Sequence, residues 1–67
     1  MIETLEARLA VASEKLRVEQ LRLVEACKWY VERQTKGAVW DLQDALMYYR
    51  NARADVWEIE QEMRLLP

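Results

Sequence analysis

The feature that most restricts the fold is the spacing of apolar residues, which repeats in alternating steps of three and four. Such spacing puts these side chains on one stripe of an α-helix, as in a coiled coil. Two ladders of this kind follow one another along the chain. The first comprises Ile2, Leu5, Leu9, Ala12, Leu16, Glu19, Leu23, Ala26 and Tyr30, and the second comprises Ala38, Leu42, Ala45, Tyr49, Ala52, Val56, Ile59, Met63 and Leu66.

The two ladders are not in the same frame. If the first ladder continued, its stripe would include Gly37 and Trp40, whereas the second ladder begins at Ala38. One straight partner helix cannot cover both stripes without a twist defect, and a glycine at the break is suited to end a helix. A single continuous helix is the alternative, because one internal glycine costs only about 1 kcal/mol.

We therefore predict an all-α fold with a single domain over residues 1–67. Its two helices, at about residues 3–34 and 38–66, form an antiparallel, coiled-coil-like hairpin that self-associates into a helical bundle. A turn near residue 36 places Leu16 beside Val56 and Leu23 beside Tyr49. Glu19, a polar member of the first ladder, then faces Ala52 and Arg53. Because a buried charge needs a partner, we predict a structural ion pair between Glu19 and Arg53.

The size of the chain favours an oligomer. A core built from 67 residues rarely supplies more than about 3–5 kcal/mol, so chains of this length often use disulfides, a metal or self-association. Cys27 is the only cysteine, which excludes an internal disulfide, and we expect it to be a small buried residue of a helix. With one cysteine and no histidine, a zinc site is not expected. Self-association remains, with a dimer as the favoured form.

Apolar residues outside the two stripes point to the interface. Val24 and Val31 flank the first stripe, and Val39, Leu46 and Tyr48 flank the second. Monomers rarely expose large apolar patches, and Trp and Met are enriched in interface centres. The predicted interface residues, on the outer faces and flanks of the two helices, are Val11, Val18, Leu21, Trp40, Met47 and Trp57.

Aromatic residues interleaved with arginines suggest a second kind of site. Aromatic rings can stack on bases, and guanidinium groups can hold phosphates. The candidate ligand-binding residues are Trp29, Arg33, Tyr48 and Arg50. A pocket built from them at a subunit interface would suit a small nucleotide.

Other classes of function are disfavoured by composition. The net charge is −2 with no basic face, so nucleic acid is not an expected partner. There is no apolar run of the roughly 18 residues needed for a membrane span. An unpaired cysteine and the lack of a visible signal peptide favour the cytoplasm. Without histidine, and with one glycine, neither a histidine-based catalytic site nor a phosphate-binding loop can be built. We expect no enzyme activity, cofactor or metal.

The function that we expect is therefore that of a small, non-enzymatic interaction or regulatory protein. It would be of the phage or bacterial inhibitor or adaptor type, and would bind a protein partner as a homo-oligomeric bundle. The alternative is an oligomeric protein that sequesters a small nucleotide at its subunit interfaces.

Overall fold

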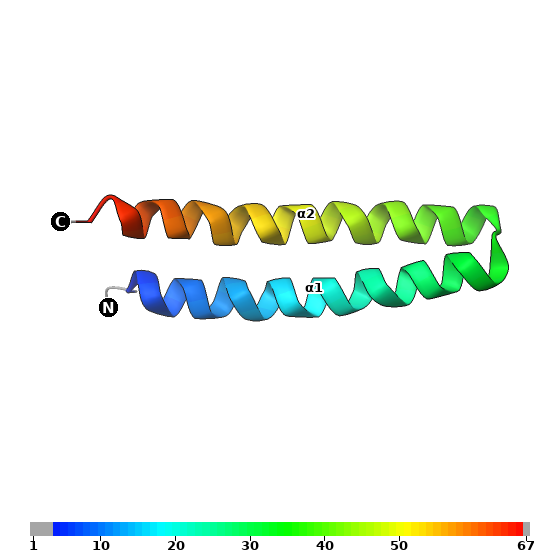
Figure 1. The fold of residues 1–67 in the computed structure, drawn as a ribbon, viewed down its shortest axis with the longest axis horizontal. Helices are drawn as coiled ribbons and strands as arrows, with labels where there is room; N and C mark the ends of the chain where they lie inside the picture. Colours follow the sequence, from blue (N-terminus) through cyan, green and yellow to red (C-terminus); the bar gives the residue numbers. More distant parts are fainter. Residues whose placement is uncertain (1–3, 67) are drawn as a thin grey trace.

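Two long helices form an antiparallel hairpin in the computed structural model, which describes residues 4–66 (Figure 1). Helix α1 spans Leu5–Arg33 and helix α2 spans Lys36–Arg64. The all-α hairpin is thus confirmed, and the single continuous helix is wrong. Both helices are slightly shorter at their outer ends than predicted. Ile2, the first residue of the predicted ladder, lies outside the described residues.

Threonines cap the starts of both helices. The Ala7 N–H donates to Thr4 Oγ1 at 3.0 Å, and the Ala38 N–H donates to Thr35 Oγ1 at 3.2 Å. Each bond satisfies one of the amide groups that the first turn of a helix leaves unpaired. Thr35 therefore fixes where α2 begins.

The turn lies earlier than predicted, and it does not use the glycine. Gln34 ends α1 in the left-handed region, with φ 48° and ψ 38°, and its N–H donates to the Tyr30 carbonyl at 2.8 Å. Gly37 is in the first turn of α2 and has no positive φ. The prediction that Gly37 ends α1 is wrong, because a threonine cap directly after Gln34 starts α2 before the glycine is reached.

The two predicted stripes meet along one seam. All their members within Leu5–Ala26 and Ala38–Met63 are buried or half-buried, whereas Tyr30 and Leu66 are exposed. The buried apolar residues among those described are Ala38, Ala45, Ala52 and Ile59. Alanine has almost no side chain to separate two helices, so these residues allow close approach, but each contributes little buried apolar area.

Residues that line the same groove show the register of the hairpin, and Leu23 with Tyr49 is one of the predicted pairs. Leu23 and Tyr49 line one groove together, Ala26 and Ala45 line another, and Ala12 and Ile59 line a third. Arg8 Nη1 lies 3.0 Å from Glu62 Oε2 and forms a cross-helix salt bridge near the chain ends. Both partners are substantially exposed, so this bridge fixes register more than it stabilises.

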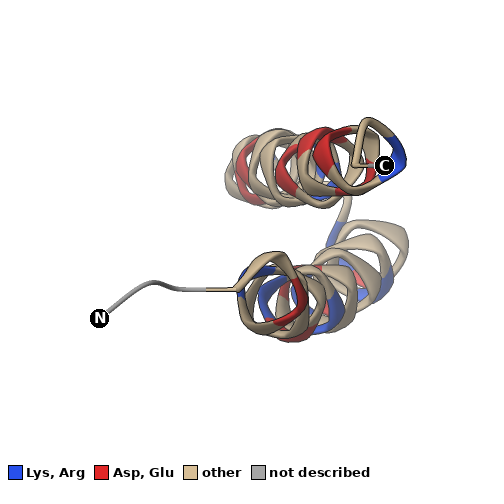
Figure 2. Ribbon diagram, turned by 90° about the vertical axis from the view of Figure 1, so that its left-hand side faces the viewer, with Lys and Arg blue, Asp and Glu red and all other residues tan. Residues whose placement is uncertain are grey.

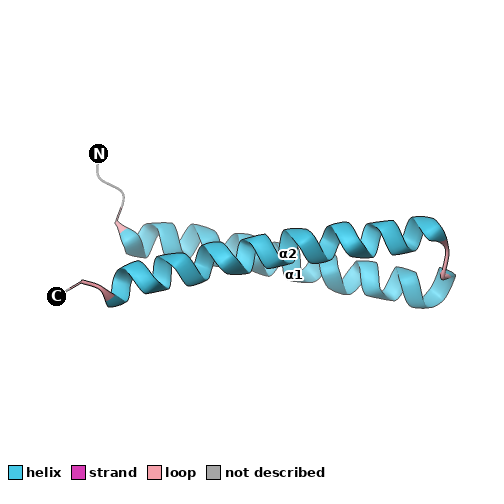
Figure 3. Ribbon diagram, turned by 90° about the horizontal axis from the view of Figure 1, so that it is seen from above, coloured by secondary structure: helices cyan, strands magenta, loops and turns pink. Residues whose placement is uncertain are grey.

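The hairpin is a narrow rod rather than a compact body. It extends 51 × 18 × 15 Å, and seen from above the two helices cross at a shallow angle (Figure 3). Its radius of gyration is 15.3 Å, whereas a compact chain of 67 residues has about 11 Å. Every residue of such a rod is therefore close to the surface. No helix within residues 4–66 combines the length and the apolar character that crossing a membrane requires.

Candidate functional site

Two grooves run along the loop-proximal half of the hairpin, on either side of the seam. The Cys27 groove is lined by Gln20, Leu23, Val24, Cys27, Lys28, Val31, Glu32 and Tyr49 and has a volume of about 580 Å³. The Trp29 groove is lined by Arg22, Glu25, Ala26, Trp29, Asp41, Asp44, Ala45 and Tyr48 and has a volume of about 450 Å³. They share no residue, so the hairpin offers two different surfaces.

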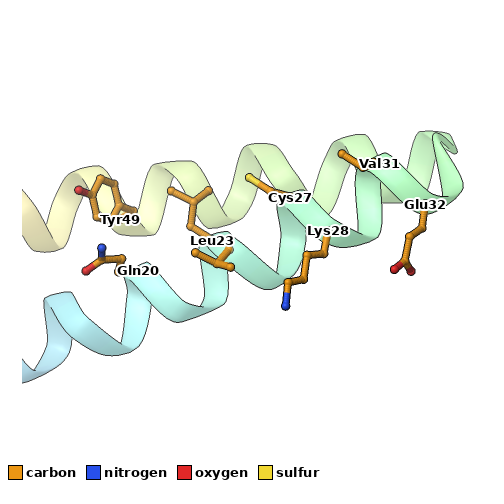
Figure 4. Close-up of a pocket in the computed structure, with 8 residues that line it drawn as sticks. Gln20, Leu23, Cys27, Lys28, Val31, Glu32 and Tyr49 are labelled. Atoms are coloured by element: carbon orange, nitrogen blue, oxygen red, sulfur yellow. The ribbon is translucent and has the colours of Figure 1, made fainter.

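The Cys27 groove has an apolar floor and a charged rim on α1. Leu23 and Cys27 extend from α1 towards α2, whereas Lys28 and Glu32 point away from α2 (Figure 4). Tyr49 closes the groove from the α2 side. Val31 is 71% exposed, and Val24 and Cys27 are also exposed. An exposed apolar strip with a polar margin is typical of a surface that packs against another helix.

The Trp29 groove combines aromatic rings with charge. Three carboxylates, from Glu25, Asp41 and Asp44, lie among its lining residues. The Arg22 guanidinium is 5.8 Å from the centre of the Tyr48 ring, and that of Arg33 is 4.1 Å from the centre of the Trp29 ring. Aromatic faces attract cations, and here the chain's own arginines occupy them. The three carboxylates outnumber Arg22, the one cation of the lining, so the groove is better suited to positively charged groups than to anions.

The four predicted ligand-binding residues do not form one site. Trp29 and Tyr48 line the same groove, and Arg33 stacks on Trp29. Arg50 lines two shallow hollows on α2 instead, one with Gln43 and Met47 and one with Arg53 and Trp57. Arg50 is therefore on a different surface, because it is two residues along the helix from Tyr48 and points in another direction.

The six predicted interface residues are all exposed, but the structure does not gather them into one patch. Val11 lies with Ala12 and Ile59 in the groove near the chain ends, whereas Met47 and Trp57 line separate hollows of α2. The denser apolar surface is the Cys27 groove, whose Val24 and Val31 are predicted only to flank the first stripe. Cys27 itself is exposed, so the expectation that it is buried is wrong.

A signal for the Cys27 groove was present in the sequence. Gln20, Val24, Cys27 and Val31 follow the same four–three–four spacing as the main ladder, one position along the helix from it. A single ladder makes an apolar stripe wide enough for one partner helix. A second ladder beside it makes the wider apolar face that is expected of a helix in a bundle.

Glu19 is buried in the seam, but it does not pair with Arg53. Its residue surface is only 7% exposed, and its Oε2 lies 3.4 Å from Nη1 of Arg22 on the same helix. Among the described residues this buried oxygen has no hydrogen-bond partner, so the contact with Arg22 is an ionic approach without a hydrogen bond. The predicted Glu19–Arg53 salt bridge is absent from residues 4–66, and Arg22 takes its place.

The position of Arg53 explains this correction. Ala52, its neighbour, is the α2 residue in the seam and is 1% exposed, while Arg53 is exposed on the flank of α2. Arg22 is one helical turn from Glu19, the distance at which side chains on one helix meet. Glu19 therefore contacts Arg22 on its own helix instead of Arg53 across the seam.

Charge elsewhere is distributed along both helices. In Figure 2 red and blue bands alternate on α1, while acidic bands predominate on α2. On α1, Arg17 Nη2 donates to Glu14 Oε1 at 2.7 Å. No group of three or more Cys, Asp or Glu side chains within the described part of the chain is arranged to hold a metal ion.

Comparison with protein-family models, with curated protein sequences and with solved structures finds no match to this chain. The geometry of the hairpin is therefore the basis of the functional proposal.

Proposed function

We propose that this chain is a non-enzymatic interaction module that self-associates into a helical bundle and binds a protein partner in that form. The observation that carries the proposal is the small core of the hairpin. The buried apolar residues among those described are three alanines and one isoleucine, and no large side chain there is fully buried. Burial of apolar area is the main stabilising term in folding, so further burial has to come from another molecule.

The exposed surface supports the same proposal. The chain exposes 5747 Å², whereas a compact monomer of its mass, 8.0 kDa, exposes about 4,450 Å². Two copies packed into one compact body would expose about 7,400 Å² and would therefore bury up to about 4,100 Å² in total. That area is in the range of obligate homodimers, which bury roughly 2,000–5,000 Å².

The Trp29 groove is the surface that we assign to the protein partner. Its two aromatic rings, Trp29 and Tyr48, are of the residue types that dominate binding energy in interfaces. Its carboxylates, from Glu25, Asp41 and Asp44, favour a positively charged segment of that partner. A regulatory protein of the inhibitor or adaptor type, which acts by occupying a partner's surface, fits these features.

The alternative, a protein that sequesters a nucleotide, is less well supported. Arg50 is on a separate surface, and the carboxylates beside Trp29 and Tyr48 would repel a phosphate. A thermal-shift measurement with a panel of nucleotides separates the two functions. We expect no shift of the melting temperature, and a concentration-dependent rise with one nucleotide would favour the alternative.

Self-association is tested by sedimentation equilibrium over a range of protein concentrations. We expect a dimer or larger species at micromolar concentration, with a melting temperature that rises with concentration. A species of 8.0 kDa alone, with cooperative unfolding, would contradict the proposal.

Partner binding is tested by comparing the host proteins retained by the wild type with those retained by Trp29→Ala. The matched control is Trp57→Ala, which also removes an exposed tryptophan but lies outside the Trp29 groove. We expect a protein that is retained by the wild type and the control and lost with Trp29→Ala. Retention that is equal with all three proteins would exclude the Trp29 groove as the binding surface.

A further inference from the structure

We propose that the Cys27 groove is the surface through which two copies of this chain pack, in a two-fold arrangement with α1 antiparallel to α1 of the partner copy. This inference rests on the self-association proposed above and adds the face, the occupant and the symmetry. The groove contains an exposed apolar strip on α1, formed by Val24, Cys27 and Val31, beside the half-buried Leu23 and Tyr49 of the seam.

The area points to a second copy as the occupant. The hairpin exposes about 1,300 Å² more than a compact monomer of its mass. A second hairpin laid along the groove covers a face of both helices, as in a four-helix bundle. A short peptide in the groove would leave most of that excess exposed. The net charge of −2 also means that two copies repel one another only weakly.

The symmetry follows from the meeting of two identical copies through the same face. Such an interface is self-complementary about a two-fold axis. The groove runs over residues 20–32 of α1, so an axis beside Cys27, at its middle, lays the groove of each copy against that of the other.

The charges of the Trp29 groove explain why the two copies pack through the Cys27 groove instead. The Trp29 groove has three carboxylates and one cation, Arg22, among its lining residues, so two such faces would repel each other in a two-fold dimer. The Cys27 groove has one cation and one carboxylate. Packing through the Cys27 groove therefore leaves the Trp29 groove accessible on the outside of the dimer.

The decisive experiment compares two valines that differ in face but not in exposure. Val31 and Val11 are each 71% exposed and both lie on α1, but only Val31 lines the Cys27 groove. Val31→Glu buries two unpaired carboxylates per dimer, and we expect it to weaken dimerisation by roughly 100-fold or more in sedimentation equilibrium. Val11→Glu should leave the dissociation constant within about threefold, as expected of a surface substitution.

The outcomes separate the two proposals. Dissociation by Val31→Glu alone supports the Cys27 groove. Equal effects of the two variants, or dissociation by Val11→Glu alone, would overturn the groove assignment while leaving self-association intact. A wild-type chain that is monomeric would overturn self-association and the groove assignment together.

Crosslinking supplies a second measurement that does not depend on the folding of a variant. Treatment of the wild type with a short bismaleimide should join Cys27 to Cys27 of the partner copy and give a covalent dimer. The matched control is Cys27→Ser with Val11→Cys, which moves the thiol to the other face. We expect no covalent dimer from the control, and a dimer from the control but not from the wild type would overturn the assignment.

Discussion

Glu19 and Arg22 form the only salt bridge with a buried partner within residues 4–66, with Oε2 of the carboxylate 3.4 Å from Nη1 of the guanidinium. Arg22 also lies over the Tyr48 ring of α2. One arginine therefore contacts a buried charge on its own helix and an aromatic ring on the other helix. The carboxylate gains little from this arrangement, because the side chain of Arg22 is 57% exposed and its charge is screened by water.

Replacement of Glu19 by leucine should stabilise the hairpin. A buried carboxylate without a hydrogen bond costs free energy, and an apolar residue of similar size removes that cost. We expect Glu19→Leu to raise the free energy of unfolding by about 1–4 kcal/mol in urea at fixed protein concentration. The control is Glu25→Leu, at an exposed glutamate of the same helix, for which we expect a change within about 0.5 kcal/mol. A loss of stability in Glu19→Leu would show that the carboxylate has a partner in the assembled protein.

A double-mutant cycle identifies the partner of Glu19. The effects of Glu19→Leu and Arg22→Leu should be coupled by about 0.5–1 kcal/mol, because the two side chains meet. The effects of Glu19→Leu and Arg53→Leu should be additive within about 0.5 kcal/mol. Coupling with Arg53 and additivity with Arg22 would restore the pair that the sequence predicts.

The turn gives a further prediction, and it concerns the glycine. Gly37 has helical geometry, and a Cβ built on it would be 3.9 Å from the nearest atom, Thr35 Oγ1. Gly37→Ala should therefore stabilise the protein by about 0.4–1 kcal/mol, because alanine loses less backbone entropy on folding. Gln34→Gly should be neutral or stabilising, since Gln34 has φ 48°. If Gly37→Ala is strongly destabilising in urea unfolding, the turn is at Gly37 after all.

Much of the fold was predictable because the hairpin depends on a periodic pattern. The frame change between Tyr30 and Ala38 predicts two helices, and the spacing of the ladders predicts the seam and its register. The pattern does not predict the cap at Thr35 or the left-handed conformation of Gln34, because several residues near a helix break can adopt a left-handed conformation or cap the next helix. The sequence marks Gly37 as the flexible residue, but the hydrogen bond to the Thr35 hydroxyl decides the boundary.

The site was less predictable than the fold. The periodic pattern specifies which face of each helix is apolar, and so the Cys27 groove could have been found from the ladder through Val24 and Val31. Which of several cations contacts Glu19 depends on side-chain reach rather than on the pattern. Arg22 and Arg53 both lie within about one helical turn of Glu19 along the hairpin axis. Arg53 does not pair with Glu19 because it is exposed on the flank of α2.

The alanines of α2 give another prediction. Ala52 is 1% exposed and lies in the seam, whereas Ala54 is exposed on the same helix. Ala52→Leu adds three carbon atoms to a close contact between the helices and should lower the free energy of unfolding by about 1–3 kcal/mol. Ala54→Leu, the matched control, should change it by less than about 0.5 kcal/mol. Equal tolerance of leucine at both positions in urea unfolding would contradict the close approach of the helices along the alanine stripe.

The last prediction concerns pH and the exposed pair on α1. The hydrogen bonds that Arg17 donates to Glu14, together with its charge, lower the pKa of the Glu14 carboxyl below its ordinary value. A lowered pKa in the folded state means that the ionised pair stabilises the protein above the ordinary pKa of a glutamate. This stabilisation is lost as the pH falls through the lowered pKa, because the carboxyl becomes protonated.

The measurement compares the melting temperatures of the wild type and Glu14→Gln across this range. We expect the wild type to be more stable at pH 7 and the difference to vanish at about pH 2, where glutamates are protonated. Because both side chains are well exposed, the difference at pH 7 should also shrink as salt approaches about 1 M. In an Arg17→Gln background, Glu14→Gln should have no such pH-dependent effect, since the partner that lowers the pKa is gone. A difference that persists at acidic pH, or that survives the removal of Arg17, would show that Glu14 stabilises α1 through another contact.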